Sequence, residues 1–149
     1  MVIKKINLKN PEQEIIQGAI KMLKDGKIIV YPTDTIYGIG CDILNKKSVQ
    51  SIQTIKNRKK PKPLSIICSD LKDISRWAIV SNIQYKILKK YLPGPFTFIL
   101  KASNDAPKIL QDPKRKTIGI RIPDNKICLE ITSGLGNPIV TTSVNLTGE

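Results

Sequence analysis

Short runs rich in β-branched residues alternate with amphipathic helical patterns along the whole chain, and this alternation limits the fold more than any other feature. Extended segments are expected at about 2–6, 27–32, 35–43, 64–68, 96–102, 117–123 and 138–143. Helical segments are expected at about 10–26, 46–56, 69–75, 81–91 and 124–136. With strands and helices mixed, and no repeat or linker between them, the chain is predicted to form one compact α/β or α+β layer structure.

Capping residues predict where several of these helices begin and end. Asn10 is expected to cap the first helix, with Pro11 at its first position and Gly26 at its end. Ser81 is expected to cap the fourth helix, and Asp124 or Asn125 the fifth. In the fourth helix, the inward side chains are expected to be Ile83, Ile87, Leu88 and Tyr91.

The residue inventory excludes several kinds of chemistry. The 149 residues include no histidine, which removes Ser-His-Asp and Cys-His catalysis and the usual metal sites. The three cysteines, Cys41, Cys68 and Cys128, are odd in number and far apart, so they are predicted to be small buried residues rather than a disulfide framework or a zinc site. No apolar run is long enough to span a membrane and no secretory signal is recognisable, so a cytoplasmic protein is expected.

Positive charge dominates the chain. There are 25 Lys and Arg residues against 12 Asp and Glu, a formal net charge of +13. Such an excess favours polyanionic partners such as RNA. A Lys-rich composition bias of the source genome explains the same numbers equally well, so charge alone does not assign an RNA partner.

Two polar segments lie at the ends of predicted strands. The first, Tyr31–Asp42, places hydroxyl groups and a carboxylate just after a buried strand, where ligand groups commonly collect; a Thr/Asp turn that satisfies its own backbone is the alternative. Its Gly38-Ile39-Gly40 lacks the third glycine and the helix start of a dinucleotide-binding motif. The second segment, Val140–Asn145, places Ser143 and Asn145 on one side of an extended run.

Cationic side chains mark two further places. Arg121 lies within the apolar run "TIGIRIP", on the face opposite Ile118, Ile120 and Ile122, and points either to water or to a cleft, where it would suit a carboxylate. Lys56 and Arg58 follow the second helix, where the helix dipole is already a sufficient reason for cations. The prolines after them stiffen the loop that presents these charges.

Taken together, these segments resemble the YrdC/YciO family, the threonylcarbamoyl-adenylate synthases and their relatives. The segments "YPTDTIYGIGCD", "KNRKKPKPLSI", "LPGPFTFIL", "TIGIRIP" and "TTSVNLTGE" occur in the family's order and at about its spacing, nearly from end to end of the chain. The resemblance implies an α/β (α+β) fold: a single-domain twisted open sheet of mixed, largely antiparallel strands flanked by helices, similar to YrdC and RibB. It also implies that residues 1–149 form a YrdC-like domain lacking its C-terminal portion, since relatives usually continue further.

The resemblance assigns roles to individual residues. Lys56, Arg58, Ser143 and Asn145 match a catalytic tetrad around the nucleotide phosphates, and Lys62 and Thr117 match further positions that contact ATP. Thr35, Arg121 and Thr141 match the pocket for the substrate threonine. No protein-bound metal is implied; Mg²⁺ is expected to be carried by ATP.

The implied reaction converts L-threonine, bicarbonate or CO2, and ATP into threonylcarbamoyl-AMP and pyrophosphate. The product would pass to the tRNA threonylcarbamoyl transferase machinery, so tRNA or double-stranded RNA is an expected partner. This chain departs from the family at Asn57 and Lys59, which replace a usual glycine and proline. "LSIICSD" and "RKTIGIRIPDN" look closer to the YciO branch, so a non-catalytic protein that binds double-stranded RNA or tRNA is the alternative.

Overall fold

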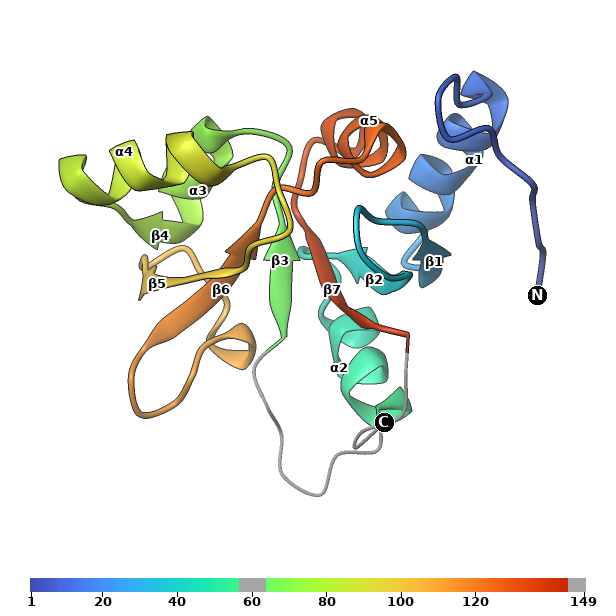
Figure 1. The fold of residues 1–149 in the computed structure, drawn as a ribbon. Helices are drawn as coiled ribbons and strands as arrows, with labels where there is room; N and C mark the ends of the chain where they lie inside the picture. Colours follow the sequence, from blue (N-terminus) through green and yellow to red (C-terminus); the bar gives the residue numbers. More distant parts are fainter. Residues whose placement is uncertain (57–63, 145–149) are drawn as a thin grey trace.

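A computed structural model describes residues 1–56 and 64–144 of the chain. Its helices are α1 (Gln13–Lys24), α2 (Lys46–Ile55), α3 (Leu71–Trp77), α4 (Asn82–Tyr91) and α5 (Lys126–Leu135), with a 3-10 turn η1 (Lys108–Leu110). Its strands are β1 (Ile29–Tyr31), β2 (Gly38–Asp42), β3 (Ser65–Ile67), β4 (Ala78–Ile79), β5 (Phe98–Ala102), β6 (Thr117–Arg121) and β7 (Ile139–Ser143). Figure 1 shows the arrangement of these elements. None of the helices in the described ranges is long and apolar enough to cross a membrane.

The described strands form one open sheet in the order β1-β2-β7-β3-β6-β5-β4. Only β3 and β6 run parallel; the other neighbouring pairs are antiparallel. The predicted mixed, largely antiparallel open sheet with flanking helices is therefore confirmed. Strand β7 lies between β2 and β3, so segments that are far apart in the sequence meet at the middle of the sheet (Figure 1).

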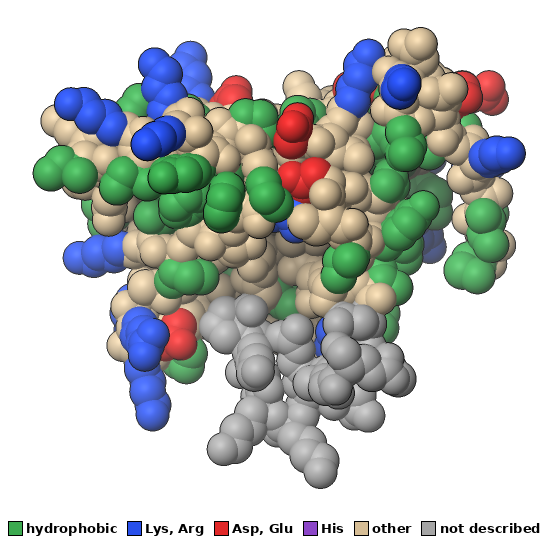
Figure 2. Space-filling model, in the orientation of Figure 1, with side chains coloured by type: hydrophobic (Ala, Val, Ile, Leu, Met, Phe, Trp, Pro, Cys, Tyr) green, Lys and Arg blue, Asp and Glu red, His purple; other side chains and the backbone are tan. Residues whose placement is uncertain are grey.

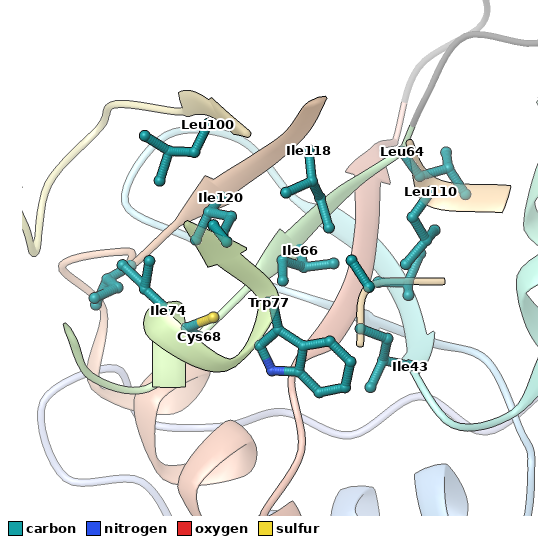
Figure 3. Close-up of a cluster of buried hydrophobic side chains, with 14 of the residues drawn as sticks. Ile43, Leu64, Ile66, Cys68, Ile74, Trp77, Leu100, Leu110, Ile118 and Ile120 are labelled. Atoms are coloured by element: carbon teal, nitrogen blue, oxygen red, sulfur yellow. The ribbon is translucent and has the colours of Figure 1, made fainter. Parts of the chain in front are cut away.

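Helices cover both faces of the sheet because each strand carries apolar side chains on alternate sides. On one face, α1 and α5 pack side by side over Ile67 and Ile139. On the other face, α2, α3, α4 and η1 contribute to a second cluster around Ile66, Ile120 and Trp77, shown in Figure 3. Each fully buried Ile or Leu contributes about 1.5–3 kcal/mol of transfer free energy.

Most predicted caps are present. The Ser81 side chain accepts a hydrogen bond from the Gln84 N–H, and the Gln84 side chain accepts one from the Ser81 N–H, which completes a capping box. Asn125, rather than Asp124, caps α5, and Gly136 ends that helix with a φ of 77°. That left-handed conformation favours glycine.

The start of the chain differs from the prediction. No strand forms at 2–6; these side chains are exposed or half-buried, and β1 is the edge of the described sheet. The prediction that Asn10 caps α1 is also wrong, because the helix begins at Gln13. A local turn competes there: Asn7 Oδ1 accepts from the Lys9 and Asn10 N–H groups, and Glu12 accepts from the Asn7 N–H.

The inward face predicted for α4 is mostly wrong as well. Leu88 is buried at 2% exposure, but Ile83, Ile87 and Tyr91 are exposed, with Ile83 at 74%. The helix itself is confirmed, and it lies near the β4 and β5 side of the sheet (Figure 1). Of its four predicted inward side chains, only Leu88 reaches the core.

Candidate functional site

A cavity of about 280 Å³ lies beside the sheet, next to the loop 33–37. Arg121 is the cationic residue among its described lining residues, and no carboxylate is among them. Most of the described lining residues carry a hydroxyl group, among them Thr33, Thr35, Ser65, Thr97, Thr141 and Ser143. A small space with one guanidinium and several hydroxyls suits a polar ligand that carries a carboxylate or another oxyanion.

Arg121 points into this cavity and not toward bulk water, which answers the question left open by the strand pattern. Its side chain is 16% exposed, and its guanidinium forms an ion pair with the carboxylate of Asp34. The same NH2 group donates to Thr35 Oγ1 at 3.0 Å. Arg121 Nε is buried and has no hydrogen-bond partner among the described residues. The protein thus holds the guanidinium through its NH2 group, and other N–H groups of Arg121 can still donate to a ligand.

Asp34 is a site residue that the sequence reasoning did not assign. Its carboxylate bonds Arg121 through Oδ1 and accepts the Asp124 N–H through Oδ2 at 3.0 Å. It therefore ties the loop 33–37 to the segment just before α5. The available signal was its position between Thr33 and Thr35, in a segment already recognised as polar; its partner lies 87 residues away and could not be inferred.

A buried tyrosine contacts the Thr141 hydroxyl. The Tyr31 hydroxyl, from the end of β1, is hydrogen-bonded to Thr141 Oγ1 on β7. Burial raises the pKa of Tyr31 far above its usual value, so the phenol stays protonated. Thr141 itself is half-buried and lines the cavity. Tyr31 was not among the predicted site residues.

The segments that carry Lys56 and Ser143 meet in the structure. Lys56 follows α2, is only 7% exposed, and donates from Nζ to the Ser143 carbonyl oxygen at 3.0 Å. Ser143 ends β7 opposite Gly38 and lines the cavity. The predicted partners Arg58, Lys62 and Asn145 lie outside the described residues.

Thr117 is a predicted site residue on strand β6. It begins β6, four positions before Arg121, and pairs with Lys101 on β5. It does not line the cavity that holds Thr35, Arg121, Thr141 and Ser143.

The three cysteines are buried and unpaired, as predicted. Burial raises the pKa of Cys41 and of Cys128 to about 12, and it raises the pKa of Cys68 as well. Protonated thiols of this kind are poor nucleophiles at neutral pH. Within the described ranges, no group of three or more Cys, Asp or Glu side chains could hold a metal ion.

Comparison with known proteins gives a consistent result. The Sua5/YciO/YrdC family model, described as telomere recombination, matches residues 21–149. The chain is 37% identical to Escherichia coli YciO over 93% of its own length and 68% of that protein, and its structure superposes on the YciO crystal structure with a TM-score of 0.88. A Methanocaldococcus jannaschii protein provisionally named threonylcarbamoyl-AMP synthase is 39% identical over 99% of this chain and 69% of that protein. The crystal structure of P. abyssi Sua5 complexed with L-threonine matches with a TM-score of 0.87 and 27% identity, over 94% of this chain and 41% of that one.

Proposed function

Because the chain belongs to the Sua5/YciO/YrdC family, we propose that it is a nucleotidyltransferase that forms L-threonylcarbamoyladenylate and pyrophosphate from L-threonine, bicarbonate or CO2, and ATP. Its product would serve the threonylcarbamoylation of adenosine in tRNA. Relatives named threonylcarbamoyl-AMP synthase and the threonine complex of Sua5 support this reaction class.

One contact carries the proposal further than family membership does. The buried Lys56 ammonium reaches the Ser143 carbonyl although 87 residues separate the two in the sequence. A cation is thereby placed at the end of β7, next to the cavity of Arg121 and Thr141. Phosphoryl chemistry needs positioned cations and neutral donors where charge builds on phosphate oxygens. We assign Lys56 and Ser143 to the phosphates, together with Arg58, Lys62, Thr117 and Asn145.

The cavity suits the amino acid. Arg121 would bind the threonine carboxylate, and Thr35 and Thr141 would order its polar groups. The substrate amine attacks carbon dioxide with loss of a proton, or bicarbonate with loss of water, and forms a carbamate, so no histidine nucleophile is needed. The carbamate oxygen then attacks the α-phosphorus and pyrophosphate leaves. Mg²⁺ would enter with the triphosphate.

Pyrophosphate release that requires both threonine and bicarbonate is the direct test. Lys56→Ala is expected to reduce the rate at least about 100-fold, because it removes a charge from the phosphate site. Lys47→Ala is the matched control, since Lys47 is an exposed lysine of the same helix region and should leave the rate unchanged. Equal rates for the unsubstituted protein and Lys56→Ala would reject the assignment.

A second candidate, binding of double-stranded RNA or tRNA without catalysis, is favoured by the net charge of +13. On the face shown in Figure 2, most of the described Lys and Arg side chains lie around the periphery. Binding of that kind should be weakly sequence-specific and should weaken with salt, with a slope of about −0.9 per neutralised phosphate for a B-form duplex. An RNA titration at two salt concentrations that found no binding, or salt-insensitive binding, would reject it.

A further inference from the structure

Tyr31 lies in a trough made by two glycines. Its side chain is 2% exposed, and its ring crosses β2 at Gly38 and Gly40, the strand that separates β1 from β7. A Cβ atom at Gly38 would lie 2.9 Å from Tyr31 Cζ, and one at Gly40 would lie 3.1 Å from Tyr31 Cε1. Only glycine leaves room for the ring at these two positions. The Gly-Ile-Gly of β2 thus allows a side chain from β1 to reach β7.

The direction of the Tyr31–Thr141 hydrogen bond follows from burial. Among the described residues, Thr141 Oγ1 is the only hydrogen-bond partner of the Tyr31 hydroxyl. A buried phenol that keeps its proton must donate it, since a buried donor without an acceptor is costly. If Thr141 were the donor instead, the phenol hydrogen would have no acceptor there. Tyr31 is therefore the donor and Thr141 Oγ1 the acceptor.

The hydrogen of the Thr141 hydroxyl is then left for the cavity. Within the described ranges, Thr141 Oγ1 has no hydrogen-bond partner other than the Tyr31 hydroxyl, and Thr141 lines the space next to Arg121. A hydroxyl oxygen that accepts a hydrogen bond from Tyr31 can still donate its own hydrogen to a ligand oxygen in the cavity. Arg121 supplies only donors as well, so both groups would favour the same kind of partner, an anionic oxygen.

We propose that Tyr31 is a positioning residue that fixes the Thr141 hydroxyl as a donor to a carboxylate oxygen of the bound amino acid. This inference rests on the proposed function, because that function places threonine in this cavity. Tyr31 acts through Thr141 and does not touch the ligand itself. With the Thr141 hydroxyl fixed as a donor, this part of the cavity offers hydrogen-bond donors to the ligand. It therefore favours a carboxylate, which accepts hydrogen bonds, over a ligand group that must donate one.

The test is a double-mutant cycle on L-threonine affinity, measured by calorimetry. Tyr31→Phe keeps the ring in its trough and should weaken L-threonine binding about three- to tenfold, the loss of roughly one hydrogen bond. Thr141→Val should weaken it at least as much, and Thr141→Ser should restore it. In the Thr141→Val background, Tyr31→Phe should cause no further loss of threonine affinity. ATP affinity should stay within about twofold throughout, a separation that a general loss of structure would not produce.

Thermal unfolding provides the second arm of the cycle. Tyr31→Phe should lower the Tm of the unsubstituted protein but raise it in Thr141→Val, where the phenol has lost its acceptor. Tyr85→Phe, at an exposed tyrosine of α4, is the matched control and should change nothing. Additive losses of threonine affinity, or unchanged threonine affinity in Tyr31→Phe, would overturn the inference alone. If the unsubstituted protein bound no L-threonine, the proposed function would be rejected, and the positioning role of Tyr31 would be rejected with it.

Discussion

Arg121 and Asp34, 87 positions apart, form an ion pair in which both side chains are largely shielded from water, at 16% and 12% exposure. The pair joins strand β6 to the loop 33–37, and Asp34 extends the link to the Asp124 N–H. The cation proposed for the threonine carboxylate is thus itself held by a carboxylate, which fixes its orientation and offsets its charge.

Replacing Asp34 should destabilise the fold. Asp34→Ala leaves the Arg121 guanidinium without its counter-ion and the Asp124 N–H without its acceptor. The expected loss is about 2–4 kcal/mol in the free energy of unfolding by urea. Asp25→Ala serves as the control, because the Lys21–Asp25 pair is exposed and should contribute at most about 0.5 kcal/mol. Similar losses for both variants would contradict the role assigned to Asp34.

Arg121→Lys should separate charge from geometry. A lysine keeps the positive charge but cannot bond both Asp34 and a ligand carboxylate with a planar fork. L-threonine affinity should therefore fall at least about tenfold. Affinity for double-stranded RNA should barely change, because Arg121→Lys leaves the number of cationic residues at 25. Parallel losses of threonine and RNA affinity would mean that the cavity is misassigned.

Two glycines with opposite surroundings test the packing around β2. A Cβ at Gly40 would lie 2.5 Å from Ile139 Cγ2 and 2.6 Å from the Val140 carbonyl oxygen. Gly40→Ala should therefore cost about 1–3 kcal/mol of unfolding free energy. Gly18, in α1, has nothing within 4 Å of the added atom, so Gly18→Ala should stabilise the helix by about 0.5–1 kcal/mol. Chemical denaturation measures the change in unfolding free energy for each variant. Equal changes would contradict the tight packing described for Gly40.

The buried cysteines predict a loss of stability in alkali. Burial raises the pKa of Cys41 and Cys128 from an ordinary 9.0 to about 12 in the folded state. The folded state therefore holds these protons more tightly than the unfolded state does. This contribution is complete below pH 9 and is lost as the pH rises from about 9 toward 12. Urea unfolding between pH 8 and 11 should show the decline, with a shallower slope in Cys41→Ala; a flat profile would contradict it.

How far local sequence could predict this fold depends on the range of each interaction. The capping box at Ser81 and the glycine stop of α5 were predictable because they involve neighbouring residues. The exposed side of α4 was not, because helical spacing shows which side chains share a face but not what covers that face. The missing strand at 2–6 has the same cause, since a β-branched run needs a partner strand.

In the candidate site, too, local features were predictable and long-range contacts were not. The polar strand ends at Thr35, Thr141 and Ser143 were recognisable, and all three line the cavity. The residues that hold them were not, since Asp34 and Tyr31 find their partners 87 and 110 positions away. In the sequence, Gly38 and Gly40 could be compared only with a dinucleotide-binding motif. In the structure they leave space for the Tyr31 ring.

The place of β7 between β2 and β3 has a consequence for biosynthesis. While the ribosome is still making residues 1–138, the hairpin of β1 and β2 has no sheet neighbour to join it to β3. The nascent chain thus exposes two unfinished sheet edges until residues 139–143 emerge, and such edges invite pairing with other chains. Early arrival of a chaperone, or rapid completion of translation, should govern the yield of native molecules.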